Sequence, residues 1–153
     1  MLAAALLACA AGIAPVTLEA VIAAESGGRA VAINVNRNGS RDFGLMQVNE
    51  AHLAAFGVTP AQVMDPCTNL RIGAFILRAD YMAASRIYGE GPRALMAALS
   101  AYNTGTFDRG FANGYVAKVY GKAVAMPAIP TIRLNPNEAS PIVEWTVEDP
   151  DPY

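Results

Sequence analysis

The hydrophobic pattern along the chain is mainly helical, and its most informative position carries a charge. Apolar residues in the segment 17–26 are spaced i, i+3 and i+4, as on one helix face: Leu18, Val21 and Ile22. The next position on that face is Glu25. A buried carboxyl is costly unless it is paired or protonated, and a general acid needs a protonated carboxyl. The alternative is that Glu25 ends the helix and points to solvent, because two glycines follow it.

The rest of the pattern predicts short helices, one long helix and a single small β-hairpin. Residues 30–35 alternate as a strand does, and Asn38-Gly39 is typical of the tight turn before a return through 43–45. A segment of the type Tyr-Asn-Thr-Gly at 102–105 is expected to be a loop. Caps, prolines and glycines set the expected helices at 2–11, 49–55, from 59–60 for one or two turns, 65–87, 92–99 and 114–124.

Composition supports one compact domain followed by a tail. Hydrophobic residues make up 54% of the 153 residues and charged residues 16%, which suits a well-buried core. Residues 1–122 hold ten basic and eight acidic side chains, whereas residues 123–153 hold one and five. The excess of two basic side chains in residues 1–122 is too small to support nucleic-acid binding. We therefore expect a domain at 1–125 and an extended, Pro-rich acidic tail at 126–153, within which residues 142–147 alternate as a docking segment does.

The N-terminal segment and the two cysteines leave alternatives open. Residues 1–16 carry no charge, so a signal peptide would lack its usual basic start, and a first buried helix is favoured. Leu6-Leu7-Ala8-Cys9 loosely matches a lipoprotein cleavage box. Cys9 and Cys67 are either two buried thiols or one disulfide, which would fit an exported enzyme. Neither has a metal-type partner nearby, so no zinc site or other cofactor is expected.

Four short segments follow one another in an informative order. They are Glu25-Ser26, the run Gly-Leu-Met-Gln-Val-Asn at 44–49, the run Ala-Tyr-Asn-Thr-Gly at 101–105, and Tyr115-Val116 with Lys118-Val119. Together they resemble the soluble lytic transglycosylases, a family with a goose-type lysozyme-like fold. The resemblance covers about residues 5–122. Cys9, the run at 65–70 and the acidic tail are most similar to the subgroup attached to type IV secretion and conjugation systems.

The resemblance implies a reaction carried by one glutamate. Glu25 would protonate the leaving oxygen between N-acetylmuramic acid and N-acetylglucosamine, and its carboxylate would then deprotonate the C6 hydroxyl, which attacks C1. The product is a 1,6-anhydro ring formed without water. Cleavage of peptidoglycan would open the wall locally for a secretion apparatus, with a monomeric enzyme expected in the periplasm and secretion components as possible partners of the tail.

The other motif residues have roles that suit this reaction. Gln47 and Asn103 offer amides to the N-acetyl group. Tyr102 can orient or donate to Glu25, and Met46 would form an adaptable apolar wall over the sugar that also desolvates Glu25. Tyr115 offers a ring face and a hydroxyl to a sugar. Ser26 is expected to bond the helix end to its neighbours, and Asn49 is expected to cap a helix. Taken singly, the same residues suit ordinary core, turn and cap positions.

Two other functions remain open at the level of sequence. Asp42, just before Phe43-Gly44, is a possible second carboxylate that would activate water and make the chain a true lysozyme. Its neighbour Arg41 instead suggests a surface ion pair. The second alternative is an assembly factor with little catalysis, for which the acidic tail and Trp145 are the best support.

Overall fold

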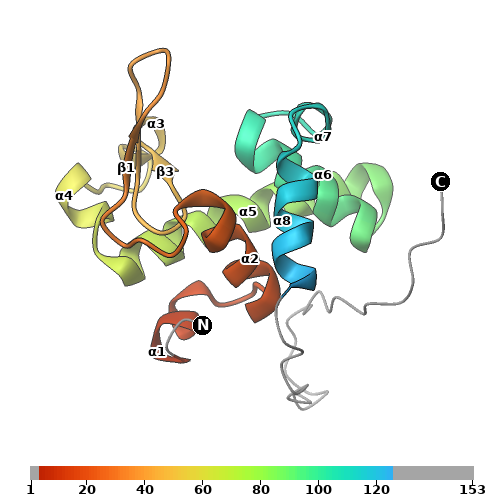
Figure 1. The fold of residues 1–153 in the computed structure, drawn as a ribbon, viewed down its shortest axis with the longest axis horizontal. Coiled ribbons are helices and arrows are strands. Elements are labelled where there is room, and N and C mark those ends of the chain that lie inside the picture. The colour runs from red at the N-terminus through yellow and green to blue at the C-terminus, as the bar shows by residue number, and fades with distance from the viewer. Residues whose placement is uncertain (1–3, 126–153) are drawn as a thin grey trace.

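The computed structural model describes residues 4–125, and its architecture is mainly helical with one small sheet (Figure 1). The expected fold class is confirmed. The expected tail, its segment 142–147 and the first three residues lie outside the described residues. The helical elements are α1 (Ala4–Leu7), the 3-10 turn η1 (Ala8–Ala10), α2 (Pro15–Glu25), α3 (Glu50–Leu53), α4 (Pro60–Val63), α5 (Pro66–Tyr88), α6 (Pro92–Thr104), α7 (Arg109–Ala112) and α8 (Tyr115–Val124).

Helix α2 is the central element and is buried on every side except at its ends. Proline occupies its first turn, where a missing N–H costs nothing. Buried residues occur around the whole helix: Thr17, Leu18, Glu19, Ala20, Val21, Ile22 and Ala24. The single apolar stripe predicted from the sequence is therefore too narrow a description. Small alanines allow neighbouring helices to approach α2 from several directions.

Helix α5 is the long helix predicted from the sequence, and it links the two sides of the molecule in Figure 1. Asp65 caps it by accepting the Thr68 backbone N–H at 2.8 Å, and this bond lowers the pKa of Asp65. Helix α6 differs from prediction, because it continues through Thr104 and makes Tyr102 and Asn103 helical. The left-handed Gly105 ends it instead, at φ 75°.

The predicted hairpin is present, and a third short strand extends it. Strands β1 (Ile33–Val35) and β2 (Arg41–Phe43) pair antiparallel, with Asn34 opposite Asp42. Strand β3 (Val48–Asn49) then pairs with β2, placing Asp42 opposite Asn49. A two-residue strand has too little periodicity to be recognised from the sequence. Its consequence is functional, because it fixes the loop between β2 and β3.

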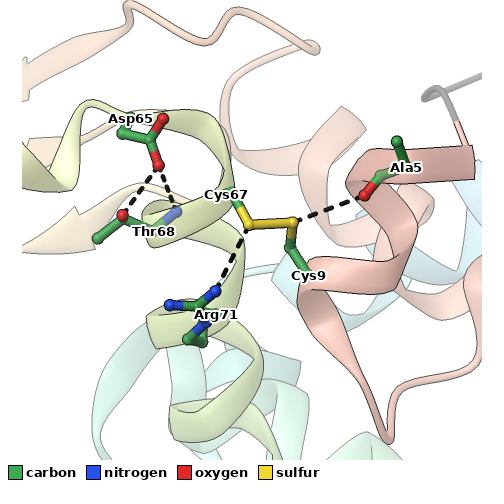
Figure 2. Close-up of a disulfide and its surroundings, with 6 residues drawn as sticks. All are labelled: Ala5, Cys9, Asp65, Cys67, Thr68 and Arg71. Carbon is green, nitrogen blue, oxygen red and sulfur yellow. Dashed lines mark hydrogen bonds between the residues drawn. A yellow bond between two sulfur atoms is a disulfide. The ribbon is translucent and has the colours of Figure 1, made fainter.

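A disulfide joins the N-terminal segment to the start of α5 (Figure 2), as the bridge alternative predicted. The Cys9 and Cys67 Cα atoms are 5.3 Å apart across 58 residues of sequence. Closing a loop of that length stabilises a fold by roughly 4 kcal/mol in the chain-entropy model. The expected first helix is present only as α1 and η1, and only Ala10 of η1 is fully buried.

The main hydrophobic core lies between α2, α5, α6 and α8, and a smaller core lies under the sheet around Phe43 and Val48. Gly73 of α5 is needed where the two meet. A Cβ there would come within 2.5 Å of the Met46 sulfur, so only glycine lets Met46 lie against this helix. In residues 4–125 no helix has the length and hydropathy needed to cross a bilayer.

Candidate functional site

The site is centred on Glu25, the last residue of α2. Its carboxyl group points toward α8 and is largely removed from solvent, although it stands at a helix end. Burial is the main cause that raises the pKa of Glu25 from 4.5 to about 7. The Glu25 carboxyl group therefore does not point to solvent, and its burial favours the protonated form.

Helix α8 supplies the groups that face Glu25. The Tyr115 hydroxyl donates to Glu25 Oε1 at 2.5 Å, and Lys118 Nζ donates to the Ala24 carbonyl oxygen at 2.5 Å. The Tyr115 hydrogen bond and the nearby charge of Lys118 both lower the pKa of Glu25 and partly oppose the effect of burial. Glu25 can therefore give up and regain its proton close to neutrality.

The loop between β2 and β3 is held against the end of α2. Ser26 Oγ donates to the Leu45 carbonyl oxygen at 2.8 Å, which confirms that Ser26 ties the helix end to its surroundings. Met46 N–H donates to Asn69 Oδ1 at 2.8 Å, and Asn69 Nδ2 donates to the Phe43 carbonyl oxygen at 2.7 Å. The left-handed Gly44 is required here, since a Cβ would collide with the Asn69 side chain.

Met46 occupies a different place from the one predicted. Its side chain is completely buried in the main core, in the same cluster as Ala24 and Tyr115. A wall over the sugar would need exposed surface, so that part of the prediction is wrong. The reason is Gly73, which opens a space for Met46 on α5. The expected contribution to an apolar surrounding of Glu25 fits this position.

Gln47 is strained and its amide N–H groups are already in use. Its φ is 50°, in the left-handed region that non-glycine residues seldom adopt. Nε2 donates to the Gly44 carbonyl oxygen at 2.8 Å and to the Ala32 carbonyl oxygen at 3.3 Å. The amide therefore fixes the loop to the hairpin, and the side-chain oxygen is left as the group that can accept from a ligand.

Tyr115 makes the hydrogen bond to Glu25 that was expected of Tyr102. The Tyr102 hydroxyl donates to the Met46 carbonyl oxygen at 2.8 Å, so the predicted bond to Glu25 is wrong for this residue. Tyr115 makes that bond instead, and it is only 7% exposed, which leaves little ring face for a sugar. Burial raises the pKa of both phenols, and the nearby Glu25 raises them further. Both therefore remain protonated donors.

Asn103 is exposed and is oriented by a neighbour that sequence reasoning did not single out. Asn113 Nδ2 donates to Asn103 Oδ1 at 2.8 Å, and Asn113 Oδ1 accepts the Tyr115 backbone N–H at 2.9 Å. This pair of bonds connects the end of α6 to the start of α8. It leaves the Asn103 amide N–H groups directed away from the pair and available to a ligand.

Asp42 lies on β2 with both carboxylate oxygens occupied. Asn49 Nδ2 donates to Oδ1 at 2.6 Å and Asn36 Nδ2 donates to Oδ2 at 2.9 Å. Asn49 also caps α3 by accepting the Ala51 N–H at 3.0 Å, as predicted. The charge of Asp42 is close enough to raise the pKa of Glu25 slightly. Arg41 pairs with Glu50 at 3.0 Å, so the expected surface pair involves a different carboxylate.

Three residues of this site were not assigned a role from the sequence: Asn69, Asn113 and Lys118. Asn69 and Lys118 act on segments distant in sequence, and Lys118 reaches Ala24 across 94 positions, whereas Asn113 bonds to residues 10 and 2 positions away. An asparagine in the interior of a long helix was the one available signal for Asn69, because such a residue is unfavourable there without a tertiary partner. Among residues 4–125 no three His, Cys, Asp or Glu side chains gather as a metal site would require.

Comparisons with known proteins agree on one family. The family model described as "Transglycosylase SLT domain" matches residues 4–124. Protein virB1 of Agrobacterium fabrum (strain C58) is 33% identical over 153 aligned positions, covering 85% of this chain and 61% of that protein. Type IV secretion system protein virB1 of Brucella suis biovar 1 is 31% identical over 167 positions, covering 88% and 70%.

A further relative, protein IpgF of Shigella sonnei, is 37% identical over 93 positions, covering 58% of this chain and 56% of that protein. The chain thus spans about 60% of the length of the Agrobacterium relatives that it matches. The family model covers most of the chain, from α1 to α8. The chain therefore belongs to the transglycosylase SLT domain family.

Proposed function

We propose that this chain is a peptidoglycan lytic transglycosylase in which Glu25 serves as both acid and base. One observation carries the proposal. Glu25 is largely buried, has a pKa raised to about 7 and accepts a hydrogen bond from Tyr115. A carboxyl group with these properties can hold a proton at neutral pH and still release it. The chain's membership in the transglycosylase SLT domain family supports the same reaction.

In the first step, protonated Glu25 donates to the glycosidic oxygen that links N-acetylmuramic acid to the next N-acetylglucosamine. The C1–O bond breaks, and the proton leaves with the N-acetylglucosamine hydroxyl. Positive charge then develops at C1 of the muramic acid residue, where its own N-acetyl oxygen can share it. Burial of Glu25 favours this step, because the neutral acid is the form that burial stabilises.

In the second step, the Glu25 carboxylate takes the proton from the C6 hydroxyl of the same sugar, and O6 bonds to C1. The product is 1,6-anhydro-N-acetylmuramic acid, and Glu25 is again protonated. Tyr115 and Lys118 support this half of the cycle, because both stabilise the carboxylate that exists between the two steps. No water is consumed.

Two exposed or half-buried amides flank this chemistry and are proposed to hold the N-acetyl groups. The Gln47 side-chain oxygen can accept an acetamido N–H, since its amide nitrogen already donates to Gly44. The Asn103 amide can donate to an acetamido oxygen, since its own oxygen already accepts from Asn113. Tyr102 acts on the loop through Met46. Its proposed role is to keep the Gln47 segment in position.

A hydrolase using Asp42 is less well supported. A general base must direct a lone pair at the attacking water, whereas each Asp42 oxygen accepts an asparagine amide that holds the carboxylate in the sheet. The transglycosylase reaction requires only one carboxyl group. The observed environment of Asp42 suits a structural role in the sheet, where it joins β1, β2 and β3.

We also propose that the chain opens the cell wall for a type IV secretion apparatus, outside the cytoplasm. The names of the Brucella relatives give this link, and the disulfide suits an oxidising compartment. In this proposal residues 1–125 cut the glycan and the acidic residues 126–153 serve other contacts. Deletion of 126–153 should leave glycan cleavage intact. Loss of secretion with retained cleavage would assign those residues to partners, and unchanged secretion would contradict a partner role.

Mass spectrometry of digested cell-wall sacculi tests the reaction. A transglycosylase yields muropeptides with 1,6-anhydro ends, each one water lighter than the corresponding reducing muropeptide. The Glu25→Gln chain, with the same fold and no acid, is the matched control and should release neither product. Reducing-end muropeptides as the main product of the wild-type chain would reject the proposal in favour of hydrolysis.

A further inference from the structure

The exposed face of α5 carries a stripe of basic and apolar residues that the catalytic site does not use. The stripe consists of Arg71, Phe75, Arg78, Met82 and Arg86. Their spacing of four, three, four and four residues places them on one helix face, opposite the buried Leu77 and Ala84. Phe75 is 62% exposed and Met82 is 52% exposed. Three cations interleaved with two large apolar side chains form an uncommon outer face for a helix.

Two adjoining hollows lie between this stripe and the N-terminal segment 8–17. The first has a volume of about 290 Å³ and lies between η1 and the part of α5 around Phe75. The second has a volume of about 360 Å³ and is walled by Thr17, Tyr81, Met82 and Leu95. Arg78 lines both hollows, and its guanidinium lies over Gly12 between them. We call these two hollows and the stripe beside them the α5 trough.

The walls of the larger hollow are mainly apolar but contain hydroxyl groups without a partner. Thr17 Oγ1 and Ser85 Oγ are buried and make no hydrogen bond within residues 4–125. Buried hydroxyls in folded proteins are nearly always hydrogen bonded. Arg78 and Arg86 at the rim form no ion pair within residues 4–125, although Glu90 also lines this hollow. The trough thus offers apolar surface, unpaired hydroxyls and unpaired positive charge.

The chain leaves the described structure beside this trough. The first turn of α8 contacts the last turn of α2, through Tyr115–Glu25 and Lys118–Ala24. Helices α2 and α8 lie side by side in Figure 1 and run in opposite directions, so the end of α8 lies near the start of α2. Thr17, in the first turns of α2, is a wall of the larger hollow. Residues 126–153 therefore begin close to the α5 trough.

The sequence that follows contains acidic and apolar side chains, which are complementary to the basic and apolar trough. Residues 142–149 read Ile-Val-Glu-Trp-Thr-Val-Glu-Asp, with apolar residues and acids interleaved. Residues 126–153 contain five acidic side chains and one basic side chain. Sixteen residues separate Ala125 from Ile142, which can span up to about 50 Å. The length is ample for the segment to return to a surface that starts beside α8.

We propose that residues 142–149 of this chain bind in the α5 trough, with Trp145 in the larger hollow and the acids paired with Arg78 and Arg86. Because the segment is tethered, its effective concentration at the trough is on the order of millimolar, and a weak contact is enough to keep it bound. The segment then lies over two hollows that are lined by neither Glu25 nor Gln47 nor Asn103. The acidic segment and the glycan site are therefore kept apart on one small domain.

Trp145 is the only tryptophan of the chain, so its fluorescence reports on this segment alone. The test compares the full chain with a synthetic peptide of residues 126–153, measuring the emission maximum and quenching by acrylamide. The bound segment predicts a blue-shifted emission and at least a twofold lower quenching constant in the full chain. Arg78→Glu with Arg86→Glu should return both values to those of the peptide. High salt should weaken the protection in the wild-type chain.

The matched control is Arg37→Glu with Arg93→Glu, which makes the same charge change at exposed residues outside the trough. It should retain the wild-type fluorescence. Circular dichroism and glycan cleavage should be unchanged in both double variants, because all four arginines are exposed. Peptide-like quenching of Trp145 in the wild-type chain would overturn the proposal. Protection that survives the Arg78 and Arg86 reversal, or that disappears on dilution as for binding between two copies, would overturn it too.

Discussion

Glu25 at the end of α2 and Asp42 in the small sheet are two carboxyl groups that differ in burial and in the hydrogen bonds that they accept. Glu25 is surrounded by core side chains and accepts one side-chain hydrogen bond, from Tyr115. Asp42 is half-buried on β2 and accepts two amide hydrogen bonds, from Asn49 and Asn36. Burial raises the pKa of Glu25 to about 7. The first environment favours a neutral acid, whereas the second holds its carboxyl group in the hydrogen bonds of the sheet.

This difference separates a carboxyl group suited to proton transfer from one that stabilises the sheet. A carboxyl group that must donate a proton has to be deprived of donors, and the alanine-rich α2 and buried Met46 do this for Glu25. A carboxyl group that joins strands needs donors, and the asparagines on the turn and on β3 supply them to Asp42. The nearby charge of Asp42 adds a small upward effect on the pKa of Glu25. The sheet therefore supports the acid without replacing it.

The largest expected effect comes from Glu25→Gln. Removing the only proposed acid and base should lower the rate of glycan cleavage by about 1,000-fold or more, measured as release of soluble muropeptides from sacculi. The fold should persist, since glutamine fills nearly the same volume. A Glu25→Gln variant that retains a tenth of wild-type activity would contradict the role of Glu25 as the acid and base.

Glu25→Gln also tests the raised pKa of Glu25, through its effect on the free energy of unfolding. Below pH 4.5 the Glu25 carboxyl is protonated in both the folded and the unfolded chain. As the pH rises toward 7, the unfolded chain loses this proton while the folded chain keeps it, so stability falls. Relative to Glu25→Gln, the wild-type chain should lose about 3 kcal/mol of unfolding free energy between pH 4 and pH 8. Urea unfolding at both pH values measures this, and a constant difference would contradict it.

Removing the one donor to Glu25 should have a moderate effect. Tyr115→Phe deletes a bond that lowers the pKa of Glu25, so that pKa should rise further. The alkaline limb of the pH–activity profile should move upward accordingly. Tyr102→Phe is the matched control, because its hydroxyl donates to Met46, and it should leave that limb in place. Equal shifts of the alkaline limb in Tyr115→Phe and Tyr102→Phe would contradict a specific effect of the Tyr115 hydroxyl on Glu25.

The smallest effect on the chemistry is expected from Asp42→Asn. The change removes an acceptor from the sheet but no catalytic proton, so the rate should fall by less than about tenfold, far below the effect of losing a general base. The products should keep their 1,6-anhydro ends. Loss of activity as large as in Glu25→Gln would make Asp42 a catalytic group and end the contrast drawn between the two carboxyl groups.

Local signals predicted the elements well and the contacts between them poorly. Asp65-Pro66 and the glycines at 89 and 91 correctly bounded α5, because caps and breakers act within one turn. The extension of α6 to Thr104 was missed. Asparagine, threonine and glycine in succession are typical of a loop, yet burial of the preceding turn and a left-handed Gly105 carry the helix further.

Within the site, the sequence identified the residues more reliably than their bonds. The motif order pointed to Glu25 and to both tyrosines, but which tyrosine reaches Glu25 depends on how α6 and α8 pack. Tyr115 and Glu25 are 90 positions apart, and no local pattern encodes that contact. The burial of Met46 likewise depends on Gly73, a missing side chain on another helix. Such pairings come from the tertiary fold alone.

The central claim is that Glu25 is a carboxylic acid near neutral pH, and a site-resolved titration tests it most directly. Carbon-13 NMR of glutamate-labelled wild-type chain, with Glu25→Gln used to assign the signal, gives the pKa of this single carboxyl group. We expect a midpoint near pH 7 for Glu25. A midpoint near 4.5 would show a carboxylate that is ionised throughout the working range, and would contradict the account.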